Sequence, residues 1–183
     1  SAAGGEAGLG STAIGASQPN TITVNATRDV ILNSGAGSGA RIGTSQVFAA
    51  PAGGDVTVNA GNSIQLNGTT QPTAIRTTGN VTLNAGSISE ASNGLIVAGG
   101  LNTTSSGNTS LTGPNQISSF TGSSGGDLTL NNSGALTVTG LNAGGNATLN
   151  NTGNVTVTGP WTATGTSTIS VASDITLGAP LTS

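Results

Sequence analysis

Apolar residues alternate with threonine in short stretches along most of the chain. Clear examples are residues 56–58 (VTV), 81–83 (VTL) and 155–157 (VTV). A period of two is typical of a strand that buries one face, and the β-branched threonine suits the exposed face. Each stretch covers only about three to five residues and is bounded by Gly-Asn, Gly-Asp or Asn-Asn pairs, which turn the chain sharply. The pattern therefore predicts many short strands and no helix.

The strand pattern recurs at a nearly constant interval in the C-terminal part of the chain. Residues 126–144, 145–164 and 165–183 align as units of 19, 20 and 19 residues, and 107–125 keeps the same length. We predict an all-β fold, a parallel β-helix (β-solenoid) of about seven turns of roughly 19–20 residues, with looped-out insertions in the N-terminal half. A sandwich built from hairpins is the alternative, but it does not explain the constant repeat length.

The regularity of the repeat divides the chain into three parts. Residues 1–19 form a Gly/Ala-rich lead-in, 20–106 form irregular β-helix turns with insertions, and 107–183 form regular turns. Within the middle part, residues 34–53 and 67–78 are surplus to a turn of about 20 residues. We expect these two segments to leave the coil as loops.

Stacked turns should place equivalent apolar residues in columns inside the coil. The intervening threonines, such as Thr129 and Thr148, should face outward. Trp161 aligns with Leu141 and Leu181, which favours its burial over the alternative of an exposed ring that stacks on sugars. We expect a core ladder of two columns, Leu111, Leu130 and Leu149 in one and Val138, Val157 and Leu177 in the other.

Asparagine directly follows the last apolar residue of a strand in several units. We expect Asn59, Asn84, Asn131 and Asn150 to stack in one corner of the coil, with side-chain amides hydrogen-bonded along its axis. The alternative is that asparagine is simply a common turn residue. The ladder is favoured because the placement recurs at one phase of the repeat.

Charged side chains are scarce, and this excludes several classes of function. They make up 5% of the chain, against about 25% in ordinary soluble domains, and the net charge is −3. Three cationic residues cannot form a nucleic-acid-binding face. Without cysteine or histidine there is no disulfide, thiol or imidazole chemistry and no tetrahedral zinc site. No apolar run approaches the ~20 residues of a membrane span.

The few carboxylates do not suggest catalysis. Asp55, Asp127 and Asp174 precede strands at a position where other units carry asparagine, so we interpret them as turn residues. A glycan-cleaving site needs clustered carboxylates, whereas Glu6, Asp29 and Glu90 are scattered. We therefore expect a protein that is not an enzyme and has no cofactor and no metal site.

Several units resemble a known family. GNVTLNA (79–85), GGDLTLNNSGALTVTG (125–140) and GNATLNNTGNVTVTG (145–159) look like the repeats of filamentous-haemagglutinin-type exoproteins of Gram-negative bacteria. SLTGPNQISSFTGSSGGDLTLNN (110–132) is similar to their central repeat region, and the resemblance covers about residues 54–183. It implies the right-handed β-helical shaft of a large two-partner-secretion adhesin, exported through a dedicated outer-membrane partner.

The expected function is a structural shaft of a secreted or cell-surface bacterial adhesin or extracellular fibre, which presents repetitive surfaces for adhesion. The expected partners are host or cell-surface glycans or proteins, and further turns of the same chain or copies of itself stacked end to end. We expect further turns or stacked copies because no capping element in the sequence shields Ile175 and Leu177. The alternative is a glycan-binding or glycan-cleaving β-helix of the tailspike type, which should show aromatic or acidic clusters, but aromatics are only 2%.

Overall fold

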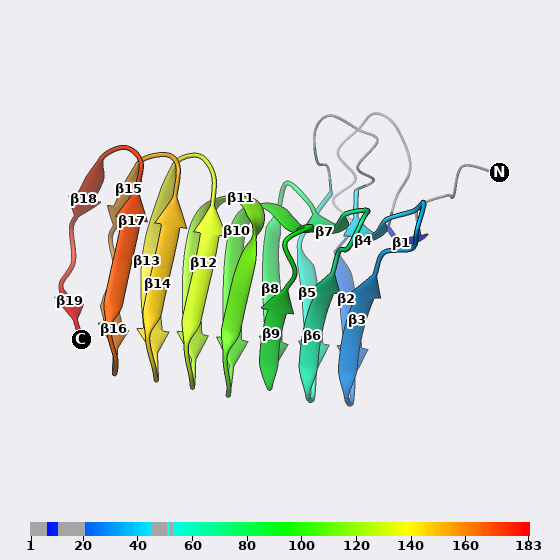
Figure 1. Ribbon diagram of the computed structural model, residues 1–183, viewed down its shortest axis with the longest axis horizontal. Helices are drawn as coiled ribbons and strands as arrows, with labels where there is room; N and C mark the ends of the chain where they lie inside the picture. The colour runs from blue at the N-terminus through cyan, green and yellow to red at the C-terminus, as the bar shows by residue number, and fades with distance from the viewer. Residues whose placement is uncertain (1–6, 11–20, 45–50, 52) are drawn as a thin grey trace.

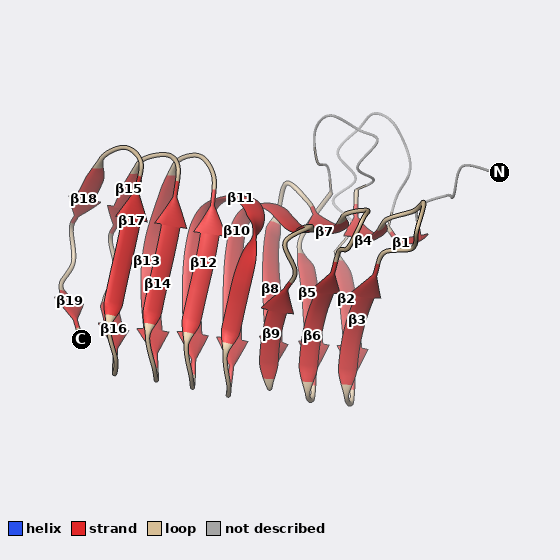
Figure 2. Ribbon diagram, in the orientation of Figure 1, coloured by secondary structure: helices blue, strands red, loops and turns tan. Residues whose placement is uncertain are grey.

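The computed structural model describes residues 7–10, 21–44, 51 and 53–183, which wind into one coil of short strands (Figure 1). Strands are joined by tight turns, and the described residues contain no helix (Figure 2). The coil advances steadily from β2 and β3 near one end to β18 and β19 at the other (Figure 1). Strands that are neighbours in the coil pair in parallel. The all-β parallel solenoid predicted from the repeat is confirmed.

Equivalent strands of successive turns stack into ladders, of which one is the most regular. It consists of β3 (Asp29–Asn33), β6 (Ser63–Asn67), β9 (Ser87–Glu90), the first part of β11 (Thr109–Ser124), β12 (Leu128–Asn132), β14 (Ala147–Asn151) and β17 (Ser167–Val171). These seven strands are joined by six parallel pairings, which make about six complete turns. The count is slightly lower than the seven predicted, because seven stacked units have six steps between them.

The other strands of each turn form two further ladders. One holds β2 (Ile22–Ala26), β5 (Val56–Ala60), β8 (Asn80–Ala85), parts of β10 (Gly94–Ser105), β11 and β13 (Leu136–Ala143), then β16 (Trp161–Ala163) and β19 (Leu181–Thr182). The other holds β1 (Ala7–Leu9), β4 (Ala40–Gly43), β7 (Thr73–Arg76), parts of β10, β11 and β13, then β15 (Val155–Val157) and β18 (Ile175–Leu177). The long strands β10, β11 and β13 continue through corners of the coil, so each of them pairs in more than one ladder.

Alternate side chains of each strand point into the coil. In β5 and β12 the residues alternate strictly between buried and half-buried. The interior positions are apolar, and at most 1% of Leu130, Leu149, Val138 or Val157 is exposed. The threonines between them are half-buried on the outer face. The register inferred from the period of two is therefore confirmed.

Trp161 is the largest side chain of the core and is fully buried. It stands in register with Leu141 on one side and Leu181 on the other. Its indole Nε1 donates a hydrogen bond to the Ser167 hydroxyl at 3.1 Å, which satisfies the polar atom of a buried ring. The expectation of burial is confirmed.

Two segments expected to form loops contain strands instead. β4 lies within residues 34–53 and β7 within 67–78, and the two strands pair in parallel. All their residues are buried, so they lack the apolar–threonine alternation by which the other strands were found. The described residues of these segments that lie outside any strand are 34–39, 44, 51, 53, 68–72 and 77–78, while 45–50 and 52 are not among the described residues. Residues 7–9 of the lead-in also form a strand, which extends this ladder.

Candidate functional site

The two apolar columns singled out in the sequence lie inside the coil. Direct register links Leu111, Leu130 and Leu149, and likewise Val138, Val157 and Leu177. All but Leu177 are buried, whereas Leu177 is 54% exposed. It lies in the last described turn, where no described strand covers it. The exposure of Leu177 therefore reflects its place in the last described turn.

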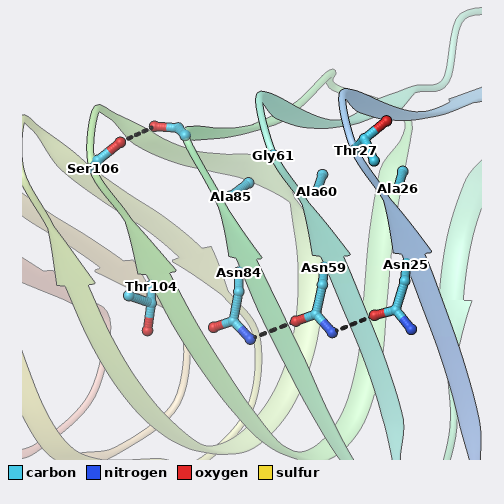
Figure 3. A pocket seen from close by; sticks show the side chains of 11 residues that line it. Asn25, Ala26, Thr27, Asn59, Ala60, Gly61, Asn84, Ala85, Thr104 and Ser106 are labelled. Carbon is cyan, nitrogen blue, oxygen red and sulfur yellow. Dashed lines mark hydrogen bonds between the residues drawn. The ribbon is translucent and has the colours of Figure 1, made fainter.

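The asparagines expected in one corner form two rows on different faces. Asn59 and Asn84 stack with Asn25 along β2, β5 and β8, whereas Asn131 and Asn150 stack along β12 and β14. The Asn84 amide donates to Oδ1 of Asn59, and Asn59 donates to Asn25, each at 2.8 Å (Figure 3). Asn150 donates to Asn131, also at 2.8 Å. The single corner was wrong because strands of two different ladders end in the same apolar–asparagine pair.

The first row, which we call row 1 (Asn25, Asn59 and Asn84), lines a shallow groove of about 660 Å³ (Figure 3). Small side chains follow each asparagine along its strand, at Ala26, Ala60 and Ala85. Thr104 takes the next position in register and so ends the amide row. Asn84 and Asn59 each donate one N–H along the row and retain a second for a ligand or for water, whereas Asn25 accepts at the end of the row. The groove thus offers one uncharged hydrogen-bonding group per turn.

A second groove of the same chemistry follows row 2 (Asn131 and Asn150), with Ser170 next in register. Its volume is also about 660 Å³, and the described residues that line it are uncharged. Both grooves are open, repetitive and neutral. Such surfaces can hydrogen-bond to a polar polymer along the axis of the coil.

Sequence reasoning missed a set of asparagines that point into the coil. Asn115, Asn132 and Asn151 are at most 4% exposed and follow one another near a corner. Oδ1 of Asn115 accepts from the Ile96 amide at 2.7 Å, and Oδ1 of Asn132 accepts from the Ile117 amide at 2.9 Å. Asn132 Nδ2 in turn donates to Asn151 at 2.9 Å. For Asn132 and Asn151 the signal was their place as the second asparagine of an Asn-Asn pair, since a period of two turns that residue inward; Asn115 follows Pro114 and had no such signal.

The aspartates interpreted as turn residues do bridge successive turns. Oδ1 of Asp55 accepts the backbone amide of Asn80 at 2.8 Å, and Oδ1 of Asp127 accepts that of Asn146 at 2.7 Å. Asn146 makes the same contact to the next turn, to Thr166 at 2.9 Å. Aspartate and asparagine are interchangeable here because only the acceptor oxygen is used.

Two other carboxylates have shifted pKa values. Hydrogen bonds from Ser63 and Asn62 lower the pKa of Asp29 at the start of β3. Burial raises the pKa of Glu90, which lies inside the coil. Glu6 lies outside the described residues. In the part of the chain that the structure describes, no three metal-ligating side chains gather, and no helix could cross a membrane.

The comparisons with known proteins agree with a repeat protein. Residues 125–182 match a family described as repeats of unknown function (DUF5649). The match covers the three most regular units, those that build β12 to β19. A search of curated proteins and a search of solved structures returned no match. Together with the fold, the family match identifies this region as a repeat-built β-solenoid.

Proposed function

We propose that the chain is a segment of the structural shaft of a secreted or cell-surface bacterial adhesin or extracellular fibre. The single observation that carries this proposal is the unbroken stack of parallel turns, six pairings long, that repeats the same outward-facing polar groups. Such a stack is rigid along its axis, because each turn is hydrogen-bonded to the turns above and below it. The resemblance of its repeats to filamentous-haemagglutinin-type exoproteins supports the same conclusion, including export through an outer-membrane partner.

The surface of the coil suits adhesion through many weak contacts. Rows 1 and 2 and the threonine columns present neutral donors and acceptors once per turn. A polymer bound along the axis would meet equivalent groups at intervals of about 4.8 Å. Contacts that are individually weak then add through multivalency. Glycans or proteins of a host or neighbouring cell are the partners that this proposal assigns.

The last described turn adds a further surface. Ile175 is 44% and Leu177 54% exposed, and both continue buried columns of the preceding turns. Exposed apolar side chains, together with backbone N–H and C=O groups that can pair with a further strand, favour the addition of another turn. The proposal therefore includes stacking on this turn, either by more turns of the same chain or by another copy.

Immunogold electron microscopy of intact cells that produce the protein tests this function. Antibodies against the regular turns, residues 107–183, should label the outside of unpermeabilised cells or shed filaments. Deleting an outer-membrane export partner of the kind that the family resemblance implies should abolish that label. Label found only after permeabilisation would contradict a role as a surface shaft.

A further inference from the structure

An acidic residue interrupts the aliphatic column of the most regular ladder. Glu90 of β9 is in direct register with Leu66 on one side and Leu111 on the other. Both leucines are fully buried, and Glu90 itself is only 5% exposed. A carboxyl group thus occupies a position that the neighbouring turns fill with leucine.

The surroundings of Glu90 are shaped to hold this side chain. Oε2 accepts hydrogen bonds from the Gly113 amide at 2.9 Å and from Nδ2 of Asn115 at 2.8 Å. Glycines leave the space, because a Cβ at Gly94 would lie 2.2 Å from Cγ of Glu90 and one at Gly113 2.8 Å from its Cδ. Oε1 is buried and has no hydrogen-bond partner within the described part of the chain. One carboxylate oxygen is therefore satisfied, whereas the other lies in an apolar interior.

Among the described residues, no cation forms an ion pair with Glu90. Glu90 is the only charged residue between Arg76 and Asp127, so β8, β10 and β11 contribute none, and neither does β6. The charged groups of the adjacent ladder are Arg41 of β4 and Arg76 of β7. Burial is the largest cause of the raised pKa of Glu90, the hydrogen bonds from Asn115 and Gly113 oppose it, and no charged group contributes. The neutral acid is thus the form that suits this site.

We propose that Glu90 is a pH-sensitive joint of the coil, at which deprotonation loosens the contact between β9 and β11. As the neutral acid, Glu90 packs in the column and completes the ladder. As the carboxylate, it places an uncompensated charge between two leucines, which is strongly unfavourable. The turns on either side contain only leucine at this position, so the effect is confined to one step of the coil.

The sign of the pH dependence follows from the direction of the shift. Glu90 has a folded-state pKa above its ordinary value of 4.5. Its contribution to stability is fully present below 4.5 and is lost as the pH rises through the folded value. Between these two values, the equilibrium constant for opening this step should rise up to about tenfold per pH unit, and it should level off above them.

Amide hydrogen exchange of the full chain tests the joint, with Glu90→Gln as the reference. The Gln variant keeps an acceptor for Gly113 but cannot ionise, so dividing the wild-type rates by its rates removes the intrinsic pH dependence of exchange. That ratio should rise with pH for the amides of β9 and of residues 109–113 and stay flat for those of β14. The matched control Asp174→Asn, at an exposed site, should behave like wild type.

A second measurement keeps the proposal falsifiable even if Glu90→Gln does not fold. The ¹³C chemical shift of the Glu90 carboxyl, followed by NMR in the wild-type chain, should titrate with a midpoint above 4.5. Amide exchange of β9 should accelerate relative to that of β14 over the same pH range. A midpoint at or below 4.5, or exchange at β9 that follows β14 at every pH, would overturn the proposal.

Discussion

Truncation of Leu149 should show how strongly the inner column holds the coil together. Leu149 is 1% exposed and lies between Leu130 and Ile169, with which it is in direct register. Replacing it with alanine removes buried apolar surface and leaves a cavity. Such a change costs about 2–5 kcal/mol, and we expect the upper part of this range because hydrogen-bonded turns on both sides prevent the walls from collapsing.

Urea unfolding of Leu149→Ala and Thr148→Ala, followed by circular dichroism, provides the comparison. Thr148 is the adjacent residue on the outer face, so its truncation should change the free energy of unfolding by only about 0.5 kcal/mol. Aspartate at the same positions should widen the difference, because only Leu149→Asp buries an unpaired charge. Equal losses at positions 148 and 149 would refute the inward and outward assignment on which the fold is built.

Three further predictions concern the buried amides, the open turn and the connections. Asn132→Ala should lower the free energy of unfolding, measured in urea, by about 1–3 kcal/mol, because it leaves the buried Ile117 amide unpaired. Asn131→Ala on the outer row should lower it clearly less, and the reverse order would be inconsistent with one inward and one outward row. Leu177→Asp should weaken self-association in sedimentation velocity, and unchanged association would show that this turn is not the contact. Proteinase K should cut the segments between β3 and β4 or between β6 and β7 before any site in residues 126–164, since the latter are held in continuous ladders, and an early cut in 126–164 would count against the uneven order.

Much of the fold could be predicted because a solenoid repeats the same local rule. The apolar–threonine–apolar pattern places Leu130 and Leu149 inward and sets their register, and the constant unit length stacks equivalent strands. The pattern could not reveal β4 and β7, because each strand buries all four of its residues and one of the four is an arginine, Arg41 in β4 and Arg76 in β7. Their place in the coil follows from pairing with neighbouring turns, which the sequence does not display.

The candidate site could likewise be predicted only in part from the sequence. Hydrogen-bonded asparagine ladders could be predicted because asparagine recurs directly after the last apolar residue of a strand. Each turn, however, has more than one strand that ends in this apolar–asparagine pair. Asn59 and Asn131 therefore looked equivalent although they lie on different faces. Glu90 appeared as one scattered carboxylate, because its burial depends on Gly94 at the start of the next strand and on Gly113 of the following turn.

Spin-label distances along one outer column test the parallel stack most directly. The chain has no cysteine, so labels can be placed at will. Ile31, Gln65, Ser89 and Thr168 belong to one column in continuous register through Ser110, Thr129 and Thr148. Pairs of labels at Thr168 and at Ser89, Gln65 or Ile31 should give separations of about 19, 24 and 29 Å by pulsed electron resonance, with steps of about 4.8 Å per turn. Separations that fail to increase in this order would contradict the stack and would favour the hairpin sandwich.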